Sequence, residues 1–247
     1  MPRIGVICAL KAEAACLSKE QTALQETVQI GPNTWLCMSG IGGEAALTAA
    51  RKLAGINVNG LISFGVAAAL EDKLTPGDLI LPKTIHKTDM HFPVTHEWRD
   101  RIIAKLAPGL RISGGALSDS AIALTSAQDK LKLGQLTGAC AADMETAAIA
   151  EFAAQKEIPF IAVRAIVDPV AFSPPTALIG TVSADGTADI WKLLPLIFNG
   201  SISLKTLFHL AMGMRAACST LKKTAALTGL DFGYALSGLD DVVGYNR

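Results

Sequence analysis

The sequence has little charge and few aromatic side chains. Only 18% of its 247 residues are charged and 50% are hydrophobic, so the chain can bury a large core and is not expected to be disordered. The 22 basic and 22 acidic residues cancel. A chain without net charge has no general attraction for nucleic acid, and an aromatic content of 5% offers few rings on which single strands could stack.

The sequence also lacks paired cysteines and long apolar runs. Its five cysteines include no Cys-x-x-Cys pair, which argues against a disulfide framework and against a zinc site. The apolar start of the chain ends at Lys11, and the longest uncharged stretch, 53–70, is interrupted by two asparagines. Neither segment predicts a signal peptide or a membrane span, so we expect a cytoplasmic protein with reduced thiols.

Short apolar segments alternate with helical segments along the chain. The run 158–167 is almost continuously apolar, which is typical of a strand that is covered on both faces of a sheet. The alternation predicts one α/β domain over residues 1–247. We expect strands at 4–9, 34–38, 60–64, 78–82, 112–117, 140–144 and 158–167, and helices at 11–20, 44–53, 97–106, 127–133, 145–155 and 203–226.

A glycine-rich segment follows the strand at 34–38, but its spacing is not that of a dinucleotide-binding loop. Gly40 and Gly42 leave Ala45 at the place of the third glycine of G-x-G-x-x-G. The chain also has no phosphate loop of the GxxxxGK[ST] type. We therefore expect no nucleotide cofactor, although these glycines allow a ligand to approach the backbone and the helix amides.

Charged residues stand at the ends of two predicted strands. Asp143 and Glu145 flank Met144 where a strand becomes an alanine-rich helix, a pattern that is also typical of a helix cap with a first-turn acid. Arg164 and Asp168 lie in and at the end of an otherwise apolar strand. A charge there is costly unless it is paired or used, and ligands of α/β sheets bind at the carboxyl ends of strands. The sequence therefore predicts a site at these ends.

These segments resemble the nucleoside phosphorylase and nucleosidase superfamily and, within it, the bacterial methylthioadenosine/adenosylhomocysteine nucleosidases. The resemblance covers about residues 1–170 and implies a three-layer α/β fold with a mixed central sheet flanked by helices. Four matching features occur in order: Ile4-Gly5-Val6-Ile7 with Glu13, Ser39-Gly40-Ile41-Gly42, Gly65 with Gly77-Asp78, and Asp143-Met144-Glu145 with Arg164-Ala165-Ile166-Val167-Asp168.

The resemblance implies that the protein cleaves the N-glycosidic bond of an adenosine-type nucleoside. Asp168 matches the acid that protonates the leaving base, which requires a raised pKa. Glu13 matches the carboxylate that positions or deprotonates the attacking water. Glu145 matches the acceptor of the ribose hydroxyls, and Met144 matches the apolar floor under the sugar. The further substrate contacts that the resemblance implies are Gly40, Phe64, Gly65, Val66, Ile122, Asp143 and Arg164.

Two departures from the family concern the group that attacks the sugar. Phosphorylases of the superfamily hold phosphate partly through an arginine and a serine around a glycine loop, where this chain has Ser63 and Val66. Water is therefore favoured as the acceptor. The resemblance implies no metal and no organic cofactor. A phosphorolytic alternative remains open, with phosphate as the co-substrate and Lys11, Arg51 or Lys52 as the cations that would hold it.

The chain beyond Pro169 does not resemble the nucleosidases. Its segment 181–186, the leucine-rich stretch 190–198 and the amphipathic helix 203–226 look like the hopanoid-associated phosphorylase subgroup. This likeness implies adenosylhopane as the substrate, with adenine and ribosylhopane as products. The two helical segments either close the sheet as a pair or form an apolar lip for a lipid, which would place the protein at the periphery of the inner membrane.

Several alternatives stay open on the sequence alone. The enzyme could be a phosphorylase that yields phosphoribosylhopane, or an ordinary methylthioadenosine/adenosylhomocysteine nucleosidase. It could also be a non-catalytic binder of a nucleoside or a lipid on the same fold. In each case the expected partner is a small-molecule or lipid-linked nucleoside and not a nucleic acid, and the superfamily implies a homo-oligomer, most simply a homodimer.

Overall fold

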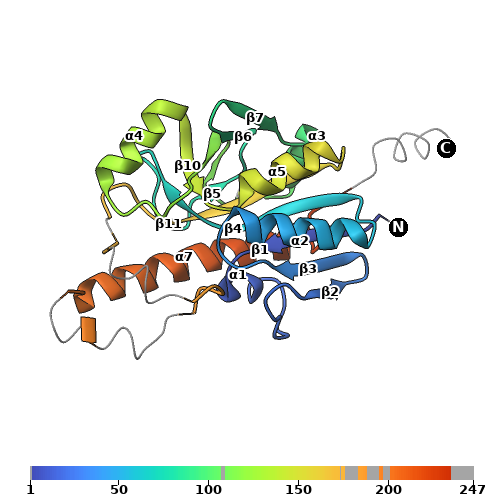
Figure 1. The fold of residues 1–247 in the computed structure, drawn as a ribbon, viewed down its shortest axis with the longest axis horizontal. Helices are drawn as coiled ribbons and strands as arrows, with labels where there is room; N and C mark the ends of the chain where they lie inside the picture. Colours follow the sequence, from blue (N-terminus) through green and yellow to red (C-terminus); the bar gives the residue numbers. More distant parts are fainter. Residues whose placement is uncertain are drawn as a thin grey trace.

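A mixed β-sheet with helices on both faces forms the body of the protein (Figure 1). The computed structural model describes residues 2–106, 109–172, 174–175, 183–187, 195–196 and 201–234. Its strands are β1 (Ile4–Cys8), β2 (Thr27–Gly31), β3 (Thr34–Met38), β4 (Gly60–Ala69), β5 (Leu79–Ile80), β6 (Thr84–Lys87), β7 (Met90–Pro93), β8 (Ile112–Ser113), β9 (Ala116–Asp119), β10 (Ala139–Asp143) and β11 (Phe160–Asp168). Its helices are α1 (Lys11–Ala14), α2 (Gly43–Gly55), α3 (His96–Leu106), α4 (Ala127–Thr137), α5 (Thr146–Gln155) and α7 (Leu204–Thr228).

Strand β4 is the hub of the sheet. Strands follow the order β2-β3-β1-β4-β10-β9-β6-β7, while β11 also pairs with β4 and continues the sheet to β5 and β8. β1 and β11 run parallel to β4, whereas β10 runs antiparallel to it. Ala68 pairs with Ala142 of β10 and with Asp168 of β11. The ends of β10 and β11 therefore meet beside the second half of β4.

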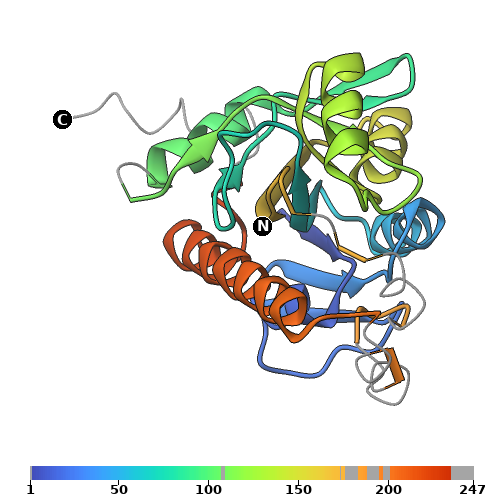
Figure 2. The same cartoon turned by 90° about the vertical axis from the view of Figure 1, so that its left-hand side faces the viewer.

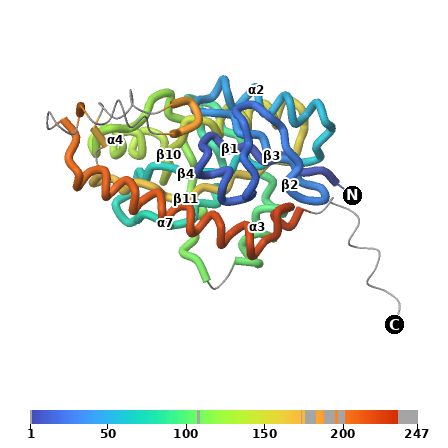
Figure 3. Tube along the Cα trace, turned by 90° about the horizontal axis from the view of Figure 1, so that it is seen from below, coloured from blue at the N-terminus to red at the C-terminus, as the bar shows by residue number. Residues whose placement is uncertain are grey.

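Two apolar cores lie on opposite faces of the sheet, as the period of two along β1 requires. Ile7 packs into the core shared with α2 and α5, whereas Ile4 and Val6 pack into the core shared with α3 and α7. Figure 2 shows α7 and α2 on different sides of the sheet, and Figure 3 shows α7 running along the length of the molecule across β11. The predicted α/β fold with a mixed central sheet between helices is confirmed.

Several predicted elements differ from those observed. The helix expected at 11–20 is only the one-turn helix α1, and the strand expected at 112–117 is divided between β8 and β9. The division falls at Gly114 and Gly115, where a Cβ atom on Gly114 would collide with the buried guanidinium of Arg99. The strand expected at 60–64 continues to Ala69, and strands β2, β6 and β7 were not predicted.

The long C-terminal helix is confirmed as α7. Its cap is Ser203, whose hydroxyl accepts the N–H of Thr206 at 3.0 Å, and Ala217 and Leu221 seat it in the core. The other predicted C-terminal helix, 190–198, lies outside the described residues except for 195–196. No helix in the described part of the chain combines the length and the hydropathy that crossing a membrane requires.

Candidate functional site

The ends of β10 and β11 and the second half of β4 surround a cavity of about 260 Å³. Side chains from α1, from the turn after β9 and from α7 complete its wall. Seven of the predicted site residues line it: Glu13, Val66, Ile122, Asp143, Met144, Glu145 and Asp168. The fold therefore brings together three carboxylates, Glu13, Glu145 and Asp168, that are far apart in the sequence.

Glu13 is held by the backbone. Its Oε2 accepts the N–H groups of Ala9 at 2.8 Å and Leu10 at 2.9 Å, and its Oε1 accepts the N–H of Val66 at 2.8 Å. The residue is 1% exposed. Burial raises the pKa of this carboxyl, while Arg164 and the three N–H donors oppose that rise. Two donors that follow β1 and one from within β4 fix the orientation of the carboxylate.

Arg164 lies beneath the cavity and uses its guanidinium inside the protein. Its Nε is 2.7 Å from Oδ2 of Asp143, and its Nη2 donates to Ser63 at 2.6 Å and to Thr146 at 2.9 Å. Its Nη1 lies 4.0 Å from Oε1 of Glu13. Arg164 is 1% exposed, so its charge needs partners inside the protein. The two carboxylates of Asp143 and Glu13 are these partners, as the sequence predicted for a charge within an apolar strand.

Gly65 makes this pairing sterically possible. A Cβ atom built on Gly65 would collide with Nη1 of Arg164 and with Oε1 of Glu13. The glycine that the resemblance assigned to a substrate contact therefore has a packing requirement of its own. It is not among the residues that line the cavity, and neither is Arg164.

The pair Asp143 and Glu145 divides two tasks between its carboxylates. Asp143 accepts the backbone N–H of Thr146 at 3.1 Å and the hydroxyl of the same residue, so it caps the start of α5 and anchors Arg164. Glu145 accepts the N–H of Gly42 at 2.7 Å. Burial, and then the negative charge of Asp143, raise the pKa of Glu145 to about 7. The cap interpretation therefore holds only in part: Asp143 accepts the N–H of the first residue of α5, but the N-cap position is that of Glu145, which makes no side-chain cap and lines the cavity.

Asp168 has a partner that the sequence analysis did not identify. Its Oδ2 lies 2.5 Å from Nζ of Lys130, which is 0% exposed on α4. Burial raises the pKa of the Asp168 carboxyl, and the ammonium of Lys130 opposes the rise. Lys130 shares one helix face with Ala127, Gly134 and Thr137, but nothing in this spacing indicates that its ammonium is buried.

Two further predicted contacts lie away from the cavity. Phe64 is buried on the other side of β4, where its ring packs against Phe232 with centroids 5.6 Å apart. Gly40 has a φ of +84° and lies against the carbonyl of Ala184. The glycine that contacts a site carboxylate is Gly42. The roles that the resemblance implies for Phe64 and Gly40 stay predictions.

The described wall of the cavity carries no positive charge. None of the described residues that line it is a lysine, an arginine or a histidine. Lys11 and Arg51, which the phosphorolytic alternative requires, line other hollows, and Lys52 donates to the carbonyl of Gln25. Within the described part of the chain, no group of three His, Cys, Asp or Glu side chains could hold a metal ion.

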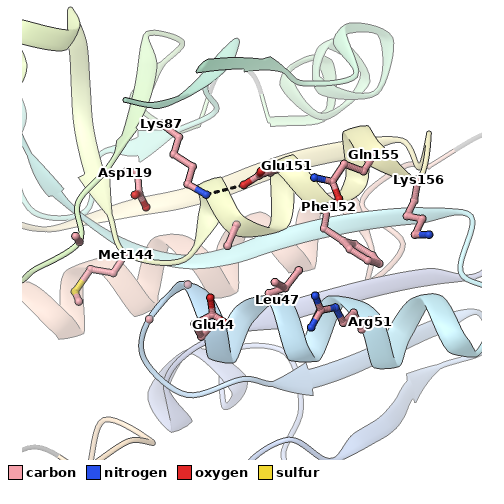
Figure 4. A pocket seen from close by; sticks show the side chains of 14 residues that line it. Glu44, Leu47, Arg51, Lys87, Asp119, Met144, Glu151, Phe152, Gln155 and Lys156 are labelled. Atoms are coloured by element: carbon pink, nitrogen blue, oxygen red, sulfur yellow. Dashed lines mark hydrogen bonds and ion pairs between the residues drawn. The ribbon is translucent and has the colours of Figure 1, made fainter. Parts of the chain in front are cut away.

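A larger hollow of about 710 Å³ lies on the other side of Met144, between α2 and α5 (Figure 4). Side chains of both signs line it, and Lys87 and Glu151 form an ion pair of 2.6 Å across one wall. Glu13, Glu145 and Asp168 do not line it. The smaller cavity is therefore the candidate site, because it is the one that the three carboxylates line.

Comparisons with known proteins bear on the family and the fold of the chain. Residues 3–190 match the family described as the Phosphorylase superfamily. No curated protein matches the sequence. Among solved structures, the 5′-methylthioadenosine/S-adenosylhomocysteine nucleosidase of Neisseria meningitidis is similar with a TM-score of 0.70 at 17% identity, covering 96% of this chain and 100% of its own.

Two other solved structures have similar values. The MTA/SAH nucleosidase of Streptococcus pneumoniae has a TM-score of 0.69 at 19% identity, covering 95% of this chain and 100% of its own. The futalosine hydrolase of Helicobacter pylori has a TM-score of 0.66 at 15% identity, with 91% and 97% covered. Similarity at these identities establishes the shared fold.

Proposed function

The chain belongs to the phosphorylase superfamily, and from this premise we propose that it is a nucleosidase that hydrolyses the N-glycosidic bond of an adenosine-type nucleoside. One observation carries the proposal: Glu13, Glu145 and Asp168 line a single cavity together with the apolar side chain of Met144. The solved structures that share the fold include nucleosidases that act on adenosine derivatives, which supports the same reaction class.

Asp168 is the acid for the leaving base. When the glycosidic bond breaks, its electron pair goes to the purine, which leaves readily only if a ring nitrogen is protonated. A buried carboxyl with a raised pKa retains a proton nearer to neutral pH and can supply it. The position of Asp168 at the end of β11, on the wall of the cavity, is suited to this step.

Glu145 and Met144 hold the sugar. Glu145 keeps one oxygen on the N–H of Gly42 and offers the rest of its carboxylate to the ribose hydroxyls. Met144 supplies an apolar surface beside it. Hydroxyl donors on a carboxylate give charge-assisted hydrogen bonds, which position the reacting carbon between the acid and the attacking water.

Glu13 positions the attacking water and takes its proton. The backbone donors that fix its orientation leave the carboxylate aligned with the cavity wall. The new bond forms between the water oxygen and the sugar carbon while the C–N bond breaks, and the proton of the water goes to Glu13. The division between an acid for the leaving group and a base for water parallels that of inverting glycosidases.

Water is proposed as the acceptor because the described site offers no cation for phosphate. Arg164 is occupied by Asp143, Ser63 and Thr146, and Val66 stands where a hydroxyl residue would contact the anion. Phosphate would also meet four carboxylates in the same cavity. Phosphorolysis to phosphoribosylhopane is the second candidate function. It would require a cation for phosphate that does not come from the described residues lining the cavity.

The proposed substrate is adenosylhopane, with adenine and ribosylhopane as products. Apolar side chains dominate the cavity wall, among them Val66, Val167 and Leu210 of α7. Three large side chains on the first turns of α7 are exposed: Leu204, Phe208 and Met212. A polycyclic substituent on the 5′ carbon would gain about 25 cal/mol for each Å² of apolar surface that it buries there. Contact between α7 and a membrane is part of this proposal.

The competing substrates are methylthioadenosine and adenosylhomocysteine. The similarity to nucleosidases for these compounds supports this alternative, and a small thioether group would fit the same apolar wall. The homo-oligomer, most simply a dimer, and the cytoplasmic location stay predictions. Sedimentation equilibrium of the purified full chain would measure the oligomeric state.

Adenine release tests the function. The purified protein is given adenosylhopane or methylthioadenosine, each with and without phosphate, and free adenine is measured. Release from adenosylhopane in phosphate-free buffer supports the proposal, and release only with phosphate makes the protein a phosphorylase. Faster release from methylthioadenosine favours the alternative substrate. Adenine binding without turnover of either nucleoside would make it a binder.

A further inference from the structure

Lys130 is a fully buried cation at the base of the candidate site. It is 0% exposed, although lysine is almost never fully buried unless it is paired. Its ammonium lies 2.5 Å from Oδ2 of Asp168 and donates to the carbonyls of Pro169 at 3.0 Å and Phe172 at 2.8 Å. These three acceptors use the three N–H donors of the ammonium, so the charge is both neutralised and fully hydrogen-bonded.

Among the groups packed around Asp168, Lys130 is the cation that contacts its carboxylate. Of the elements packed around Asp168, α4 contributes Lys130, and β4 contributes the apolar Ala68 as its strand partner. The charged groups that share the cavity are all acidic: Glu13 from α1, and Asp143 and Glu145 at the junction of β10 and α5. From α7, His209 lies beyond Phe172, with the two ring centroids 6.1 Å apart.

We propose that Lys130 is a positioning residue that holds Oδ2 of Asp168 and stabilises the carboxylate left when Oδ1 gives its proton to the base. The inference rests on the proposed role of Asp168 as the acid. In the reacting complex the proton moves from Oδ1 to a purine nitrogen as the C–N electron pair enters the ring. The negative charge that remains on Asp168 is then balanced by the ammonium 2.5 Å away.

Lys130 has opposite effects on the protonation of Asp168 and on the rate of proton transfer, and together they predict a characteristic change in the pH dependence of activity. Burial raises the pKa of Asp168 and Lys130 limits that rise, so losing the cation leaves more of the acid protonated. The same loss makes transfer of the proton harder, because the resulting carboxylate is buried without a partner. Removing Lys130 therefore lowers the maximal rate while moving the alkaline limit of activity to higher pH. A purely structural role would lower the rate without moving that limit.

The experiment compares Lys130→Met with Lys132→Met, which removes an exposed lysine two residues away on the same helix. The first readout needs no substrate: aspartate carboxyls are labelled with ¹³C and titrated by NMR, with Asp168→Asn used only for assignment. We expect the pKa of Asp168 to rise by at least one pH unit in Lys130→Met and to stay at its wild-type value in Lys132→Met. An unchanged pKa in folded Lys130→Met would overturn the proposal.

Two measurements keep the test decisive if Lys130→Met does not fold. Lys130→Gln retains an N–H donor without the charge and should show the same direction of shift. In the wild type, the ¹⁵Nζ signal of Lys130 should change as Asp168 titrates, and a signal that ignores this titration contradicts the pairing.

Activity then separates this inference from the proposed function. In Lys130→Met, kcat should fall at least tenfold with its alkaline limit at higher pH, and Lys130→Arg should restore that limit. If wild type releases no adenine from any nucleoside, the nucleosidase proposal fails while the NMR result still decides the pairing. If kcat falls without movement of the alkaline limit, the positioning role is wrong.

Discussion

The two ends of the cavity are built in different ways. At one end, Glu13, Arg164 and Asp143 form a buried chain of charges that backbone N–H groups and the hydroxyls of Ser63 and Thr146 complete. At the other end, Asp168 depends on one side chain from α4 and on the loop that leaves β11. The first end is held within the sheet, whereas at the second end Asp168 belongs to the sheet but its support comes from outside it.

This difference assigns separate duties to the two ends. A carboxylate fixed by backbone N–H groups of β4 and of the turn after β1 can keep one geometry for water and sugar whatever the substrate. An acid supported by a helix and a loop can be tuned by changes that leave the sheet intact. Substitutions at the first end should therefore cost mainly stability, and those at the second should cost mainly rate.

Arg164→Met should have the largest effect, and on stability. It leaves Glu13 and Asp143 buried without their shared cation, and breaking a buried pair in this way costs about 3–5 kcal/mol of unfolding free energy. Arg111→Met is the matched control, because Arg111 is exposed and its partner Asp78 keeps the N–H and the hydroxyl of Thr75, so the loss should be about 1 kcal/mol or less. Urea denaturation measures both. Equal losses of unfolding free energy in the two variants would show that the buried charges of the first end contribute no more to stability than the exposed arginine does.

Asp168→Asn should abolish most of the adenine release while leaving a folded protein. Losing a positioned general acid costs about 10²–10⁴-fold in kcat. The amide oxygen can still accept from Lys130, so circular dichroism should remain that of the wild type. Asp129→Asn, an exposed neighbour of Lys130 on α4, is the control and should keep its rate. Near-normal turnover by Asp168→Asn would take this residue out of the mechanism.

Glu145, whose carboxyl feels the charge of Asp143 at the first end, tests whether a substitution there also costs activity. Its pKa of about 7 means that the folded protein keeps a proton between about pH 4.5 and 7 that the unfolded chain has released. The unfolding free energy contributed by Glu145 is therefore highest below pH 4.5 and falls by up to about 3 kcal/mol as pH rises to 7.

Glu145→Gln removes this dependence. As pH rises from 5 to 8, the wild type should lose unfolding free energy and the variant should not, so the variant becomes more stable relative to the wild type. The variant should also lose adenine release, because the ribose hydroxyls lose their charged acceptor. Urea denaturation at the two pH values, on both proteins, measures the difference. A variant with the same pH slope as the wild type would mean that Glu145 is not the group that titrates in this window.

The sequence predicted the first end better than the second, for a physical reason. Asp143 and Arg164 of the first end lie in strands whose apolar runs are visible, so a charge among them is conspicuous; at the second end the same holds for Asp168 but not for its partner. Lys130 lies on a surface-like helix, and only the folded position of α4 reveals that its ammonium is buried. Burial of one lysine is a tertiary fact that no local pattern contains.

Tertiary contacts also explain why several predicted helices and strands differ from those in the structure. Segment 11–20 has helical composition, yet two of the three donors that hold Glu13 come from the turn into α1, and the helix ends after Ala14. The run 112–117 looks like one strand because nothing in it shows that Arg99 comes close to Gly114. Strand β4 extends to Ala69 because β10 and β11 provide partners for its small residues.

Phe208→Ser should have the smallest effect, and it tests the outer edge of the second end. Phe208 is 64% exposed, so its loss should change the unfolding free energy by no more than about 0.5 kcal/mol. If α7 contacts the polycyclic part of adenosylhopane, the KM for that substrate should rise about three- to tenfold, because part of the apolar burial is lost. The KM for methylthioadenosine, which has no such group, should stay unchanged. Leu227→Ser, an exposed apolar residue at the far end of α7, should alter neither. Equal KM values for adenosylhopane in Phe208→Ser and wild type would place the apolar group of the substrate elsewhere and leave the exposed turns of α7 without a part in its recognition.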